Sequence, residues 1–248
     1  NVYYTFTYGT VIINSKFLEN KVETRRPYIG GGAIFLNSNY VWIAFRDNVF
    51  KSNQAITGAA IYGTVYQLNF ARDLFEMNGN NNSPGGAITV MSSRSIIVND
   101  TLFYRNVGFL GSAINCLASS CIVQSCKFSG NEARNGAIFT GTASSLQVSN
   151  SVFDKNSAFE GAAIFTNQKA QIVKSSFLFN SANNYGGAIV CNSTSSVDNI
   201  ELKYNIFVGN KAAYYGTDVH AKSSSLKIEG LLPNITYEPR AFVPDKIG

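Results

Sequence analysis

The stretch that decides the fold is residues 153–189, which read FDKNSAFEGAAIFTNQKAQIVKSSFLFNSANNYGGAI. It holds two copies of each of two short units. The first unit is Phe-x-x-Asn, at Phe153–Asn156 and again at Phe177–Asn180. The second is Gly-small-Ala-Ile, at Gly161–Ile164 and again at Gly186–Ile189. A segment that repeats two units in the same order indicates a repeat protein.

The same two units alternate along nearly the whole chain. Successive Phe-x-x-Asn units lie 24 to 33 residues apart, at Phe17–Asn20, Phe50–Asn53, Phe75–Asn78, Phe103–Asn106, Phe128–Asn131, Phe153–Asn156, Phe177–Asn180 and Phe207–Asn210. The second unit has clear copies at Gly31–Ile34, Gly58–Ile61, Gly85–Ile88, Gly111–Ile114, Asn135–Ile138, Gly161–Ile164 and Gly186–Ile189, and a degenerate copy at Gly216–Val219. Strict alternation over this length favours a solenoid.

Residues between the two units have the pattern of β-strands. Ser95–Val98, Ser145–Val148 and Gln171–Val173 are rich in β-branched residues and alternate in polarity. No segment has an apolar stripe at helical spacing, and a propeller blade would need about 40 residues. The sequence therefore predicts an all-β fold, a right-handed parallel β-helix of about eight coils over 1–229. Residues 230–248, which are not repetitive, are expected to form a cap or a linker.

Stacked coils place like residues above one another, about 4.8 Å apart. We expect the eight Phe rings to form a ladder inside the stack. We expect the eight Asn side chains to form an external or turn ladder whose amides bond to adjacent coils. The first position of the second unit is Gly or Asn, so we expect a left-handed backbone there, including at Asn135.

Composition and charge narrow the classes of function. Charged residues make up only 14% of the chain, which disfavours a helical bundle. The formal net charge is +5, but the basic residues are scattered, so nucleic acid is not expected as a partner. No apolar run reaches the length of a membrane span. The chain starts at Asn1 without Met, and this start is expected of a mature product or a fragment.

The alternation of Phe-x-x-Asn with Gly-Gly-Ala-Ile resembles the repeat of the chlamydial polymorphic outer membrane proteins. Similar repeats occur in large surface proteins of protists. The resemblance covers roughly residues 11 to 220. It implies a parallel β-helix displayed outside the cell, often with a role in adhesion. The C-terminal membrane barrel of the chlamydial proteins has no counterpart in this sequence.

No catalytic or metal-binding constellation is found in the sequence. The acidic residues do not line up from coil to coil, so we expect no enzymatic activity, no cofactor and no metal. Among the four cysteines, Cys116 and Cys121 are candidates for a disulfide across one turn. Cys126 stands two residues before a motif Phe, where other coils carry Asp, Ser or Asn, so a turn position is expected for it.

Two kinds of surface feature are candidates for function. Asn99, Asn192 and Asn234 begin N-glycosylation sequons. The first loop carries Arg25, Arg26 and Tyr28, which form a candidate ligand loop, although a solvated insertion is the simpler interpretation.

The leading functional hypothesis is an extracellular or cell-surface module for adhesion or recognition. Its expected partners are proteins or glycans at a cell surface. The alternative is a building block of a fibre or coat, in which copies stack end to end. A polysaccharide lyase or hydrolase is the third hypothesis.

Overall fold

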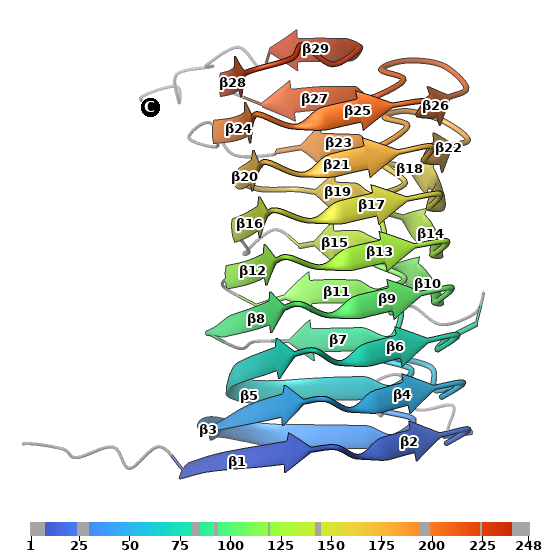
Figure 1. Cartoon of the computed structure of the whole chain (residues 1–248), viewed down its shortest axis with the longest axis vertical. Helices are drawn as coiled ribbons and strands as arrows, with labels where there is room; N and C mark the ends of the chain where they lie inside the picture. The colour runs from blue at the N-terminus through green and yellow to red at the C-terminus, as the bar shows by residue number, and fades with distance from the viewer. Residues whose placement is uncertain are drawn as a thin grey trace, which may run out of the picture.

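The computed structural model describes residues 8–23, 30–80, 85–91, 94–118, 120–141, 145–193, 199–223 and 225–239. Within these ranges the chain forms strands and turns but no helix, and its sheets are parallel. Figure 1 shows the strands stacked in columns from β1 to β29. The predicted all-β parallel solenoid is confirmed. Its eight Phe-bearing strands span about seven turns, and its handedness stays a prediction.

The described strands form three sheets along the stack. A 16-stranded sheet bends around two sides. Its strands are β1 (Tyr8–Ile13), β3 (Ile34–Arg46), β5 (Ile61–Ala71), β7 (Ile88–Met91), β8 (Ser95–Asn99), β11 (Ile114–Leu117), β12 (Ser120–Gln124), β15 (Ile138–Thr140), β16 (Ser145–Ser149), β19 (Ile164–Thr166), β20 (Ala170–Val173), β23 (Ile189–Asn192), β24 (Asn199–Lys203), β27 (Val219–Ser223), β28 (Ser225–Glu229) and β29 (Ile235–Pro239).

The other two sheets are built from short strands. An eight-stranded sheet carries the Phe residues. Its strands are β2 (Lys16–Leu18), β4 (Val49–Lys51), β6 (Leu74–Glu76), β9 (Leu102–Tyr104), β13 (Lys127–Ser129), β17 (Val152–Asp154), β21 (Ser176–Leu178) and β25 (Ile206–Val208). A five-stranded sheet follows the Asn residues of five coils. Its strands are β10 (Val107–Leu110), β14 (Glu132–Asn135), β18 (Ser157–Glu160), β22 (Ser181–Ala182) and β26 (Lys211–Ala212).

The Phe ladder forms as predicted. Neighbouring rings stack nearly parallel, with centroids 4.6 Å apart between Phe128 and Phe153 and 5.0 Å apart between Phe177 and Phe207. The six inner rings are completely buried. The Ala and Ile of the second unit line the same core, with Ala137 and Ile138 fully buried. Stacked rings and aliphatic side chains therefore fill the inside of the solenoid.

The Asn ladder forms too, but inside a turn rather than on the outside. Asn131 is fully buried. Its Oδ1 accepts hydrogen bonds from both the backbone N–H and the Nδ2 of Asn106, each at 3.0 Å. Its Nδ2 donates to the Phe103 carbonyl and to Oδ1 of Asn156. One side chain thereby joins three coils, and every donor and acceptor of its amide is used.

The left-handed corner of the second unit lies at glycine, with one departure from expectation. Gly161 has φ 55° and Gly111 has φ 58°, as predicted. In the coil that begins with Asn135, however, the positive φ belongs to Gly136 (63°), and Asn135 continues strand β14. Glycine tolerates this conformation at lower cost than asparagine, so the turn shifts by one residue.

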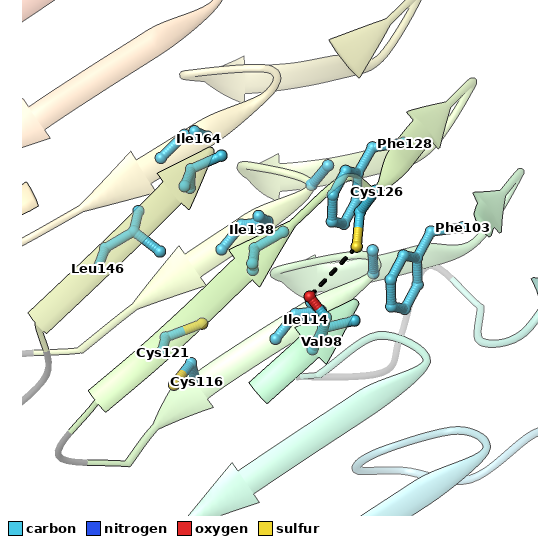
Figure 2. Close-up of a cluster of buried hydrophobic side chains, with 14 of the residues drawn as sticks. Val98, Phe103, Ile114, Cys116, Cys121, Cys126, Phe128, Ile138, Leu146 and Ile164 are labelled. Atoms are coloured by element: carbon cyan, nitrogen blue, oxygen red, sulfur yellow. Dashed lines mark hydrogen bonds between the residues drawn. The ribbon is translucent and has the colours of Figure 1, made fainter. Parts of the chain in front are cut away.

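A second column of polar side chains lies two residues before each Phe and is buried from Asn48 onward, and Cys126 belongs to it. Its backbone N–H donates to the Ser151 hydroxyl, and its thiol donates to the carbonyls of Val98 (3.4 Å) and Gln124 (3.1 Å). The bond to Val98 is drawn in Figure 2. The predicted turn position of Cys126 is confirmed.

The degenerate copy of the second unit ends the Asn ladder. Asp218 stands where other copies have Ala. Its Oδ1 accepts from Nδ2 of Asn210 at 2.9 Å, and its Oδ2 accepts from the backbone N–H of Asn234 at 2.8 Å. Within the tail, β29 pairs with β27 in parallel. Asp218 therefore replaces the next Asn of the ladder and ties the tail to the last turns.

Candidate functional site: an aromatic–arginine face

The five-stranded sheet places alternate residues on the outer surface of the stack. Gly108, Ala133, Ala158, Ala182 and Ala212 occupy one column that points inward. The next residue of each strand must then point outward, because side chains alternate along a strand. In Figure 1 these strands form one side of the solenoid, at the right of the view.

Three outward residues form a stack on this side. Arg134 lies between Phe109 and Phe159, which come from the coils on either side of it. Its guanidinium carbon is 5.1 Å from the centroid of the Phe109 ring and 5.5 Å from that of Phe159. Both rings remain about two fifths exposed. Each cation–π contact contributes about 0.5–1 kcal/mol at an exposed site, so the two rings hold the guanidinium in place.

A tyrosine cluster continues the surface toward the last turns. Tyr185 stacks on Tyr215 with centroids 5.8 Å apart and lies 6.1 Å from Tyr214. It also stacks on His220 at 5.0 Å. Tyr214 is 70% exposed and Tyr215 is 58% exposed. We call the six residues Phe109, Arg134, Phe159, Tyr185, Tyr214 and Tyr215 the aromatic–arginine face.

Glu160 connects the two parts of this face. Its Oε1 accepts from Nδ2 of Asn184 at 2.7 Å, and its Oε2 accepts from Nδ2 of Asn135 at 3.4 Å. A hollow of about 100 Å³ lies beside it, lined by Glu160, Phe165, Tyr185, Val190, Asn192, His220 and Lys222. A second hollow of about 180 Å³ lies beside Arg134, lined by Gly108, Phe109, Glu132, Ala133 and Arg134.

A small apolar layer lies beside the face. Phe139, Phe165 and Val190 project from β15, β19 and β23 and are almost fully buried. The Phe139 and Phe165 rings stack with centroids 5.7 Å apart. Leu110 and Tyr185 pack on this layer. Tyr185, a member of the aromatic–arginine face, is therefore anchored by packed side chains.

The predicted surface candidates lie elsewhere or cannot be compared. Arg25, Arg26 and Tyr28 fall outside the described residues. Asn234 is exposed, whereas Asn99 and Asn192 are half-buried. Only Asn192 borders the aromatic–arginine face, as a lining residue of the smaller hollow. Glycosylation of the three sequons stays a prediction.

The cysteine pair Cys116 and Cys121 lies in the core. Both are buried free thiols on β11 and β12 (Figure 2). A hydrogen bond joins the two thiols. That bond, together with burial, raises the pKa of Cys121. Burial also raises the pKa of Cys126 and of Cys191 to about 12. The structure brings the predicted pair together without a disulfide, and their oxidation stays a prediction.

Other kinds of site are not found in the described part of the chain. Its residues include no group of three or more His, Cys, Asp or Glu that could hold a metal ion. In those ranges there is also no helix that could cross a membrane.

Sequence reasoning missed the aromatic–arginine face. The signal that could have found it is the small residue two positions after the motif Asn, as in Asn131-Glu132-Ala133. That position predicts a third inward column, and hence an outward position immediately after it. Read in that way, Phe109, Arg134 and Phe159 would have appeared as one exposed column.

Comparison with known proteins identifies no relative of this chain. The chain matches no protein-family model, no curated protein and no solved structure at a significant level of similarity.

Proposed function

We propose that this chain is an extracellular or cell-surface recognition module that binds its partner through the aromatic–arginine face. The observation that carries the proposal is the exposed stack of Phe109, Arg134 and Phe159. Aromatic residues, phenylalanine included, and arginine are enriched at the buried centre of protein interfaces. The resemblance to the chlamydial surface repeat supports display outside the cell.

Rigidity is the second support for this proposal. The rings and the guanidinium are arranged before any partner arrives, so little conformational entropy is lost on binding. Outward side chains on the turns of the stack vary from coil to coil, while the core repeats. A solenoid of this kind can therefore present a specific surface without altering its fold.

Binding of the purified, fluorescently labelled protein to cells tests the proposal. The variant Phe109→Ser, Arg134→Ser, Phe159→Ser should bind at least about tenfold more weakly than the wild type, since hot-spot losses exceed 2 kcal/mol. A matched control removes two rings and one cation elsewhere: Tyr40→Ser, Lys174→Ser, Tyr204→Ser. The proposal fails if the two variants bind alike, or if the wild-type protein binds no cells.

A building block of a fibre or coat is the second candidate. The terminal strand β25 exposes Ile206 and Val208, which are 47% and 45% exposed, and β2 exposes Leu18. Strand edges with exposed apolar side chains can pair with another copy. Light scattering of the native protein tests this function. A strictly monomeric protein at high concentration would count against it.

A further inference from the structure

The Arg134 guanidinium is an exposed charged group that two aromatic rings hold in position. It lies over two rings, with its Cζ atom 5.1 Å from the centroid of Phe109 and 5.5 Å from that of Phe159. Across the described ranges, none of the ion pairs involves Arg134. A guanidinium fixed in this way presents the edges of its N–H groups to solvent, and these edges match a carboxylate in a bidentate geometry.

The adjacent hollow supplies two further kinds of contact. Its volume is about 180 Å³. Phe109 contributes an apolar ring, and Glu132 contributes a carboxylate on the same outward side of the strand pair β10–β14. Gly108 borders the hollow without a side chain, and a Cβ there would come within 2.7 Å of the Gly86 Cα atom. The hollow thus combines an apolar surface, an anionic acceptor and a cationic donor.

We infer that this hollow binds an acidic sugar residue, a pyranose that carries a carboxylate. The inference rests on the proposed recognition function and names its partner class. The sugar carboxylate pairs with Arg134, the apolar C–H side of the pyranose packs on the Phe109 ring, and the sugar hydroxyls donate to Glu132. These three contacts use the three chemistries that the hollow offers.

Glu132 makes the hollow selective for an acidic sugar over other anions. Sulfate and phosphate have no hydroxyl-rich face to donate to a carboxylate, and the Glu132 charge repels them. A highly sulfated glycan meets the same repulsion at several points. A sugar with one carboxylate and several hydroxyls satisfies both charged residues at once.

Isothermal titration calorimetry with two acidic sugars tests the inference. The probes are a hexasaccharide of alternating glucuronic acid and N-acetylglucosamine, and 3′-sialyllactose; they distinguish a uronic acid from a sialic acid as the source of the carboxylate. Their controls are the carboxyl-reduced hexasaccharide and lactose. Removal of the carboxylate should weaken binding about tenfold or more, because a charge-assisted pair is lost.

Variants of the full chain identify the contacts. Arg134→Lys keeps the charge but loses the planar fork, so it should weaken binding of the acidic sugar about tenfold. Glu132→Gln should weaken it by a smaller factor and should relieve the exclusion of inorganic sulfate. Lys174→Ala, an exposed cation on another corner, should leave the affinity unchanged.

Two results would overturn the inference. One is equal binding of each acidic sugar and its uncharged control, and the other is the absence of binding to both acids. If the wild-type protein still binds cells through the aromatic–arginine face in either case, the sugar assignment fails and the recognition function stands. If it binds no cells, the recognition function itself fails.

Discussion

At the scale of single residues, the buried amide ladder has the largest predicted effect. Asn131→Ala would remove the acceptor of the Asn106 backbone N–H, one of the two acceptors of its Nδ2, and the Nδ2 donor to the Phe103 carbonyl. Each buried polar group left unsatisfied costs about 1–3 kcal/mol, so we expect a loss of roughly 3 kcal/mol or more in unfolding free energy. Urea denaturation measures it. Asn20→Ala, at the half-buried end of the ladder, should cost less; an equal loss would contradict this account.

Asp73 makes the stability of the folded state depend on pH. Burial raises its pKa above the ordinary value of 3.8, although hydrogen bonds from Asn48 oppose the shift. The native state therefore binds this proton more tightly than the unfolded state does. The stabilisation from this proton is full below pH 3.8 and is lost as the pH rises through the raised native pKa.

The variant Asp73→Asn removes that dependence. Asn occupies the same position at Asn48 and Asn205, where its Nδ2 donates to a carbonyl of the preceding coil. The Phe45 carbonyl would be the matching acceptor, since Phe45 pairs with Ile12 in register. We expect a higher melting temperature at pH 7 and a flatter pH profile in thermal unfolding. A wild-type profile retained in the variant would show that another group titrates.

At the scale of elements, the corners can be tested with a matched pair of substitutions. Gly161→Ala places a Cβ 2.5 Å from the Ile164 carbonyl at φ 55°, so it should destabilise the fold by about 2 kcal/mol or more. Lys155 has a positive φ of 53°, and the equivalent residues of two other coils are Gly130 and Gly209. Lys155→Gly should therefore remove the backbone strain of a non-glycine residue at this position. It should be neutral or slightly stabilising in urea denaturation. Opposite signs would refute the assignment of these corners.

The sequence predicts those elements that stacking forces to repeat. Phe153, Asn156 and Ile164 recur because each must fit the same residue in the coils above and below. The five-stranded sheet was missed because its inward column tolerates either Gly108 or Ala133, which is a weak signal. Its outward residues are not constrained by stacking, so Phe109 and Arg134 share no motif. The candidate site could therefore not be predicted from the repeat.

At the scale of the whole molecule, stability should depend on position along the stack. Phe128 is fully buried between two rings, whereas Phe17 ends the ladder and is only half-buried. Phe128→Ala should cost about 3–5 kcal/mol, the usual range for a buried ring. Phe17→Ala should cost less and should loosen mainly the first turn, because each turn contacts only its neighbours. Hydrogen exchange measures both effects; equal, global loosening by Phe17→Ala would contradict this prediction.

The central claim is that a partner is bound at the side of the solenoid. Hydroxyl-radical footprinting of the protein, free and bound to cell-surface glycans, measures it most directly, because exposed aromatic side chains are oxidised unless covered. We predict that Phe109, Phe159, Tyr214 and Tyr215 become protected, while Tyr40 and Tyr204 stay reactive. Protection of Tyr40 and Tyr204, with the four rings of the aromatic–arginine face still reactive, would contradict the account.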